Sequence, residues 1–258
     1  MIRNDLYTVL YSHAIGMNPL IELLQANLNT IFVNEDGIED SFELLPPLTA
    51  QEISSFEASL PCSLPDEIRE LLRFARGFRG VLDEITFGGP GMEFGLENIF
   101  PHAISIAGDG FGNFWVVDLT TESVTWGPIF YVCHDAPAIV YQAPSLLRFI
   151  EEAIRFGNKP WKSEIDDVHE ALSTRIWREN PGVLSHADCL AIGDAEMTEF
   201  ANSLDDTWQF VDLRNAKVGD GYSWGRYGAK TANRRFGERP VFAYQRKSLG
   251  RRFLDAWR

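Results

Sequence analysis

The chain has 258 residues, of which 45% are hydrophobic and 23% charged, and its formal net charge is −14. These values are typical of a globular protein with one large domain or two small ones. Because phosphate binding requires a basic surface, the acidic balance speaks against nucleic acid as the main ligand.

The charge is spread unevenly along the chain. Before Arg214 there are 11 Lys and Arg against 34 Asp and Glu, and from Arg214 onward there are 12 against 3. We therefore expect an acidic body with a basic C-terminal end. An acidic body favours cationic partners and speeds their approach, although it can also serve solubility alone.

The N-terminus lacks the apolar stretch and cleavage site of a signal peptide, and no segment approaches the roughly 18 apolar residues of a membrane helix. The three cysteines, Cys62, Cys133 and Cys189, are far apart and show no C-x-x-C spacing. This pattern argues against a disulfide framework and against a zinc knuckle. We therefore expect a cytoplasmic protein with no membrane span.

Helical patterns dominate the first 80 residues. Residues 19–28 place leucines on one face, which predicts a helix. Thr49 and Glu52 have the spacing of a capping box, which predicts the start of a second helix. A third helix is expected after Pro65, which suits a first helical turn, and Gly77 is expected to form its C-terminal cap.

The periodicity changes to that of strands between residues 80 and 135. The predicted strands are residues 84–87, 103–107, 114–119 and 129–134. A further helix is expected from Pro144-Ser145 to Gly157. The order of helices, then strands, then a helix predicts an α+β fold with an antiparallel sheet.

The stretch GDGFGNFWVVDL, residues 108–119, joins two of these strands. Its glycines suggest a phosphate loop, but an aromatic and β-branched run follows instead of a helix. Calcium binding would need an oxygen where Phe111 stands. We therefore predict a tight hairpin turn rather than a ligand loop.

The region after Pro160 begins with another capping-box pattern, Ser163 to Asp166, and a helix is expected to run from there to residue 179. The other elements predicted in this region are a helix at 195–204, strands at 208–213 and 240–244, and a helix at 249–257.

A loop at residues 219–239 mixes glycine, aromatic and basic residues. Such a loop could bind nucleic acid by stacking and charge neutralisation. The acidic chain favours the other interpretation, in which the rings pack on the C-terminal region and the arginines pair with the acidic body.

Four pieces in the middle of the chain occur in the order known from one protein family: LTAQEISSFEASLPCSLPDEIRELLRFARGF, AISIAGDGFGNFWVVDL, IFYVCHDAP and APSLLRFIEEAI. They make this part of the chain similar to the SUKH superfamily, which includes the Smi/Knr-type cell-wall-assembly regulators. The resemblance implies an α+β fold with a curved antiparallel sheet and helices packed on one side. The chain would then divide into an N-terminal helical extension (1–45), a SUKH-like core (46–158) and a C-terminal α+β region (159–258) that is basic at its end.

The resemblance also implies a binding module rather than an enzyme, with no catalytic motif, cofactor or metal. Bacterial members of the superfamily are widely taken to be immunity proteins that neutralise toxins, often nucleases. Eukaryotic members act as signalling or cell-wall regulators, so a regulatory scaffold is the alternative. The residues that match the family pattern are expected to be structural: Pro65, Gly77, Gly108, Asp109, Gly112, Asn113, His134 and Asp135.

Carboxylates in the first hundred residues are the candidate contacts for a protein partner, which we expect to be a basic toxin domain. A carboxylate-rich face could mimic phosphates and enter the cleft of a basic nuclease, while aromatic side chains would hold the complex. Solvated loop charge and core phenylalanines are the alternative. The candidate residues are Asp36, Glu39, Asp40, Asp83, Glu84, Glu93, Glu97 and Phe94.

Catalytic and metal sites have weaker support. Cys133 and His134 are neighbours on a strand and point to opposite faces, so they cannot form a dyad with each other. The lone histidines without metal-ligand spacing are His102, His169 and His186. An enzyme site in the C-terminal region remains a further alternative, although no nucleophile–base pair is found there. Its candidate residues are Asp212, Tyr222 and Trp224.

Overall fold

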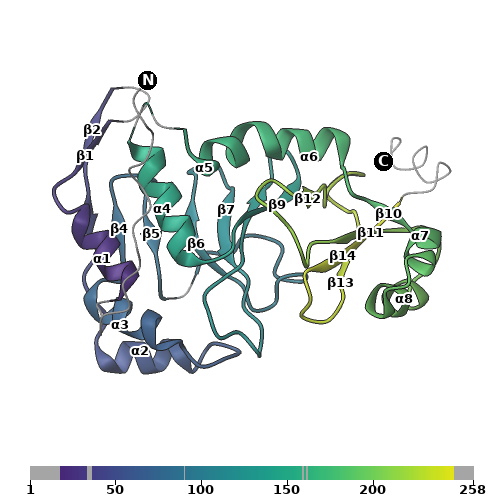
Figure 1. Cartoon of the computed structure of the whole chain (residues 1–258), viewed down its shortest axis with the longest axis horizontal. Helices are drawn as coiled ribbons and strands as arrows, with labels where there is room; N and C mark the ends of the chain where they lie inside the picture. The colour runs from purple at the N-terminus through teal and green to yellow at the C-terminus, as the bar shows by residue number, and fades with distance from the viewer. Residues whose placement is uncertain (1–17, 34–36, 90, 159, 161, 247–258) are drawn as a thin grey trace, which may run out of the picture.

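The computed structural model describes residues 18–33, 37–89, 91–158, 160 and 162–246 (Figure 1). The candidate contact Asp36 and the helix predicted at 249–257 lie outside these residues. Among the described helices, none combines the length and the apolar character needed to cross a membrane.

The first part of the chain contains three helices and several short strands. The elements are α1 (Pro19–Ala26), β1 (Ile31–Val33), β2 (Glu39–Ser41), β3 (Glu43–Leu44), α2 (Ala50–Glu57), α3 (Asp66–Phe74), β4 (Gly77–Arg79) and β5 (Ile85–Thr86). Strands β1 and β2 form a hairpin, and β3, β4 and β5 form an antiparallel sheet. The predicted capping box is confirmed, since the Glu52 N–H donates to Thr49 and Glu52 accepts from the Thr49 N–H.

Two predictions for this part are wrong. Residues 1–45 were expected to be a helical extension, but β1, β2 and β3 all lie within that range. Gly77 does not cap a helix, because α3 ends at Phe74 and Gly77 begins strand β4. A Cβ atom on Gly77 would lie 2.0 Å from the carbonyl oxygen of Ile85 on the paired strand. Close backbone approach, rather than helix capping, therefore requires glycine here.

The centre of the molecule is an antiparallel sheet with strand order β12–β9–β8–β7–β6. Its strands are β6 (Ile104–Gly108), β7 (Phe114–Val117), β8 (Ile129–Cys133), β9 (Ala138–Ala143) and β12 (Gly221–Tyr222). The predicted hairpin is confirmed, since β6 pairs with β7 and Gly108 lies opposite Phe114. Strand β9 was not predicted.

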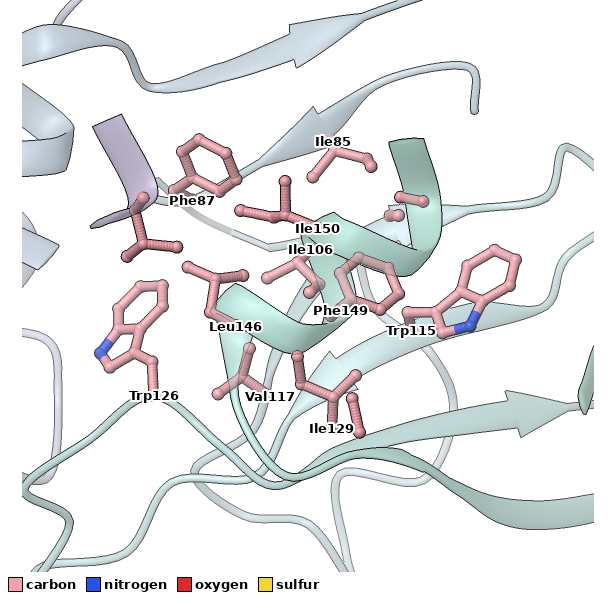
Figure 2. Packing of buried hydrophobic residues seen from close by; sticks show 14 of the residues in the cluster. Ile85, Phe87, Ile106, Trp115, Val117, Trp126, Ile129, Leu146, Phe149 and Ile150 are labelled. Atoms are coloured by element: carbon pink, nitrogen blue, oxygen red, sulfur yellow. The ribbon is translucent and has the colours of Figure 1, made fainter. Parts of the chain in front are cut away.

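Helix α4 (Leu146–Gly157) covers one face of the central sheet (Figure 2). Its buried residues Leu146, Phe149 and Ile150 belong to one apolar cluster with Trp115 and Val117 of β7. Helices α1, α2 and α3 contribute to the same cluster. The expected α+β fold, with helices on one side of an antiparallel sheet, is confirmed.

The C-terminal region begins with a helical segment made of α5 (Glu164–Asp166), the π-helical turn η1 (Asp167–Leu172) and α6 (Ser173–Glu179). Then follow β10 (Leu184–Ser185), α7 (His186–Ala191), α8 (Ala195–Asn202), β11 (Trp208–Asp212), β13 (Asn233–Arg235) and β14 (Val241–Gln245). Strands β10, β11, β14 and β13 form a further antiparallel sheet, the C-terminal sheet, at the right of Figure 1.

This C-terminal sheet covers the second face of the central sheet. Val116 and Phe130 point away from α4 because side chains alternate along a strand. They belong to a separate apolar cluster with Phe242 and Tyr244 of β14. Both faces of the central sheet are therefore buried, and the surfaces that it leaves for binding are its edges and loops.

Three further contacts attach the C-terminal region to the core. Strand β12 pairs with β9. The indole N–H of Trp224 donates to the Cys133 carbonyl at 3.0 Å. Arg235 forms two hydrogen bonds with Asp118, at 2.8 and 2.7 Å. These contacts bear out the second interpretation of the 219–239 loop, in which its rings and Arg235 pack on the protein itself.

Candidate functional site

The turn between β6 and β7 is fixed by Asp109. Its Oδ1 atom accepts hydrogen bonds from the backbone N–H of Phe111 (2.8 Å) and of Asn113 (3.1 Å). Gly110 and Gly112 adopt φ values of 78° and 90°, a region that favours glycine. The sequence GDGFGN therefore forms the tight turn that was predicted, with Phe111 at its tip.

The other carboxylate oxygen of Asp109 joins the turn to two more elements. Oδ2 accepts from Asn113 Nδ2 (2.6 Å), from the Tyr131 hydroxyl (3.2 Å) and from His169 Nε2 (3.0 Å). Burial raises the pKa of Asp109, but the hydrogen bonds from Asn113, the backbone and His169 outweigh it and lower the pKa. The carboxylate is therefore held ionised at the centre of a network.

Asn113 extends this network to the loop after β8. Its Nδ2 also donates to Asp135 at 2.9 Å, and its Oδ1 accepts from the His134 N–H at 2.7 Å. The His134 ring lies 2.8 Å from the Phe94 carbonyl oxygen, so its Nε2 carries the proton. Asp109, Asn113, His134 and Asp135 of the family pattern thus meet in one cluster that holds two loops together.

His169 is the member of this cluster that sequence reasoning missed. It lies in the π-helical turn η1, stacks on Trp115 with ring centroids 6.1 Å apart, and its side chain is 37% exposed. The sequence contained no direct signal, because His169 is 60 residues from Asp109. The π-helical turn itself is a feature that often marks functional positions.

Two clefts flank the hairpin turn. The first, about 350 Å³, lies between the β1–β2 hairpin, the β4–β5 turn and the Asp109 network. The second, about 510 Å³, lies on the other side, along β6 and the turn. Asp83 and Gly108 line both clefts. The β6–β7 turn therefore lies beside two clefts that share Asp83 and Gly108 in their walls.

The structure brings some of the predicted carboxylates together at these clefts. Asp40 and Asp83 line the first cleft beside Asp109, and Asp83 and Glu84 line the second. Glu84 also pairs with Arg79 at 2.7 Å. Carboxylates from three separate stretches of sequence thus surround the hairpin end of the central sheet.

Other predicted contact residues lie elsewhere or serve local structure. Glu97 accepts hydrogen bonds from the backbone N–H of Phe94 and of Gly95. Phe94, predicted as an aromatic anchor, is only 3% exposed and packs against Phe100. Glu39 and Glu93 are exposed but line neither cleft.

Exposed apolar side chains accompany the carboxylates, and they were not predicted. Phe111 is 81% exposed at the tip of the turn. Met92 (55%) lines the second cleft, and Ile38 (61%) and Val33 (43%) line the first. The face around the hairpin end, which we call the hairpin face, combines carboxylates with apolar groups. It comprises Val33, Ile38, Asp40, Asp83, Glu84, Met92, Asp109 and Phe111.

The residues considered for catalysis are occupied by structural contacts. Burial raises the pKa of the Cys133 thiol, which disfavours a thiolate nucleophile. In the C-terminal region, Asp212 pairs with Arg214 at 2.7 Å, and Tyr222 is fully buried. No group of three or more His, Cys, Asp or Glu side chains suited to a metal ion occurs among the described residues.

Comparison with known proteins gives a family match. Residues 47–152 match the SMI1 / KNR4 family (SUKH-1). No curated protein and no solved structure matches the chain. The matched segment runs from the residues before α2 into α4 and includes the β6–β7 turn, whereas His169 and the β1–β2 hairpin lie outside it.

Proposed function

We propose that the protein is a cytoplasmic, non-enzymatic binding module that neutralises a basic protein toxin, because residues 47–152 match the SMI1 / KNR4 family (SUKH-1). This match is consistent with an immunity role and equally with a Smi/Knr-like regulatory role. The choice between the two rests on the chemistry of the hairpin face.

The observation that carries the proposal is the gathering of the exposed Asp40 and Asp83 around the first cleft, which the largely buried Asp109 also lines. These carboxylates lie beside exposed apolar groups, which is the composition of a protein-binding surface. Their sign favours a cationic partner and would raise its association rate. A basic nuclease domain has the surface chemistry that fits, because its own substrate is a polyanion.

The buried sheet supports placing the interface at this end of the molecule. The C-terminal sheet and α4 cover both faces of the central sheet, so neither face is open to a partner. The hairpin face is one of the loop surfaces that remain, and the acidic majority of the chain lies before Arg214. An enzyme site is not part of the proposal, because the candidate nucleophile Cys133 is buried with a raised pKa.

The test begins with capture of partners by the full-length, tagged chain from cells of its own source, at low and at high salt. One dominant basic protein, released by salt, is expected. That protein is then expressed in a bacterial host with and without this chain. Growth that is arrested by the partner alone and restored by co-expression supports neutralisation.

A charge-matched pair of variants makes the test specific. Asp40→Asn with Asp83→Asn removes two charges from the hairpin face and is expected to reduce both capture and protection. Glu199→Gln with Asp206→Asn removes two exposed charges from the C-terminal region and is expected to leave both unchanged. Binding of many partners without growth protection would favour the regulatory role and refute neutralisation.

A further inference from the structure

We propose that Phe111 is the apolar anchor by which this chain holds its basic protein partner. The inference rests on the proposed function and deepens it, since it names the contact that fixes the complex. The carboxylates of the hairpin face would then serve mainly to attract and select the partner.

The first argument is the position of the Phe111 ring. Among the described phenylalanines, Phe111 alone is mostly exposed, at 81%. It belongs to none of the apolar clusters and none of the aromatic pairs of the described residues. The fold uses only the backbone N–H of Phe111, which donates to Asp109 and which any non-proline residue could supply. The ring is therefore left for contacts outside the chain.

The second argument is the rigidity of the turn that carries the ring. Asp109 accepts two backbone hydrogen bonds within the turn and is itself held by Tyr131 and His169. A side chain on such a support loses little backbone freedom on binding, so more of its contact energy becomes affinity. Aromatic residues presented in this way are typical centres of binding energy.

The third argument is the surroundings of the ring. Gly110 and Gly112, on either side of Phe111, line the second cleft together with Met92, Asp83 and Glu84. An apolar centre with a charged rim is the usual anatomy of a protein interface. The rim carries the carboxylates of Asp83 and Glu84, and Glu84 forms an ion pair with Arg79. The occupant with complementary charge is a basic protein surface that has an apolar pocket for the ring.

The same charges argue against a second copy of this chain as the occupant. A two-fold symmetric contact would place the hairpin face of one copy against that of the other, so Asp83 and its neighbours would lie close to the same carboxylates of the second copy. Like charges at close range oppose association. A basic partner removes this cost and gains attraction from the same groups.

The experiment compares Phe111 with Val124, which is 82% exposed in the loop between β7 and β8, at the opposite end of these strands. The probe is the purified basic protein that the wild-type chain retains at low salt. Phe111→Ala is expected to raise Kd at least about tenfold, whereas Val124→Ala stays within about twofold of wild type. Thermal unfolding of both variants is expected to match wild type, because neither side chain is buried.

Site-specific photo-cross-linking supplies a second readout that does not depend on affinity. p-Benzoylphenylalanine replaces Phe111 or Val124 in the full-length chain, and the complex is irradiated. A cross-link to the basic protein from position 111 but not from 124 supports the anchor.

The experiment distinguishes failure of the anchor from failure of the proposed function. If the wild-type chain retains the basic protein but Phe111→Ala binds equally well, or position 111 gives no cross-link, the anchor is refuted and the proposed function stands. If the wild-type chain retains no basic protein, the proposed function fails and the anchor fails with it.

Discussion

Replacing Arg235 by methionine is expected to weaken the attachment of the C-terminal sheet to the core. Arg235 and Asp118 are 5% and 2% exposed and share two hydrogen bonds. Methionine is of similar length and can keep apolar contact with Phe100 and Phe242, whose ring centroids lie 5.4 and 5.5 Å from the guanidinium carbon. What the substitution removes is the charge that compensates buried Asp118.

The size of the effect follows from that uncompensated carboxylate. Removing one partner of a buried ion pair costs about 3–5 kcal/mol, because the remaining charge stays out of water. Arg235 also donates to the carbonyl oxygens of Ile99, Glu238 and Arg239, so the substitution leaves these three acceptors without that donor as well. For a chain of this size the expected fall in Tm is on the order of 10 °C.

The pH dependence gives the prediction a distinctive sign. Burial raises the pKa of Asp118, and loss of the opposing Arg235 raises it further. An acid whose folded pKa exceeds its unfolded value stabilises the fold at low pH and loses that contribution as pH rises. The stability deficit of Arg235→Met relative to wild type should therefore shrink between pH 7 and pH 5.

Calorimetric unfolding of both proteins at pH 7 and pH 5 provides the assay. Asp118→Asn in the Arg235→Met background serves as a control, since it removes the stranded charge and should recover stability at pH 7. A Tm of Arg235→Met within about 2 °C of the wild-type Tm at both pH values would refute the reasoning, because the buried ion pair would then contribute nothing to attachment.

Three further changes have expected outcomes. Gly77→Ala should destabilise the fold by several kcal/mol in urea unfolding, because its Cβ would lie 2.0 Å from the Ile85 carbonyl oxygen, and wild-type stability would contradict the paired-strand geometry. Asp109→Asn should cost about 1–3 kcal/mol at pH 7. The pKa of Asp109 is lowered in the fold, so this difference should shrink as pH falls below about 4, and a constant difference would exclude the carboxylate as the cause. Iodoacetamide should modify Cys62 before buried Cys133, as peptide mass spectrometry can follow, and equal rates would contradict the packing.

Local signals account for the parts of the fold that could be predicted. The capping boxes at Thr49 and Ser163 and the turn at Asp109 each depend on residues within about four positions of one another. Such contacts are visible in sequence because residue type and spacing determine them. The order of the strands in the core followed from the turns between them.

Non-local contacts account for the parts that were missed. Strand β12 has only two residues, Gly221 and Tyr222, and exists because β9 lies beside it. Gly77 was interpreted as a cap because its sequence position after α3 is typical of one, whereas the strand that requires glycine is eight residues further on. Sequence patterning cannot supply partners that only the folded chain brings together.

In the candidate site, too, residue types could be predicted from the sequence, whereas contacts between distant segments could not. Asp40 and Asp83 were predicted as contact residues from composition, but their meeting with Asp109 depends on the packing of three separate segments. His169 was passed over as a lone histidine because its partner lies 60 residues away. Phe111 was considered only as a residue that cannot bind calcium. The sequence alone does not show that a phenylalanine between two glycines has an exposed side chain.

Hydrogen exchange of the full-length chain, with and without its captured basic partner, tests the central claim most directly. We expect added protection in residues 109–113, 82–84 and 38–40, which carry the hairpin face, and none in the β7–β8 loop around Val124. Protection confined to that loop, or to α7 and α8, would contradict the account, because the partner would then bind a surface other than the hairpin face.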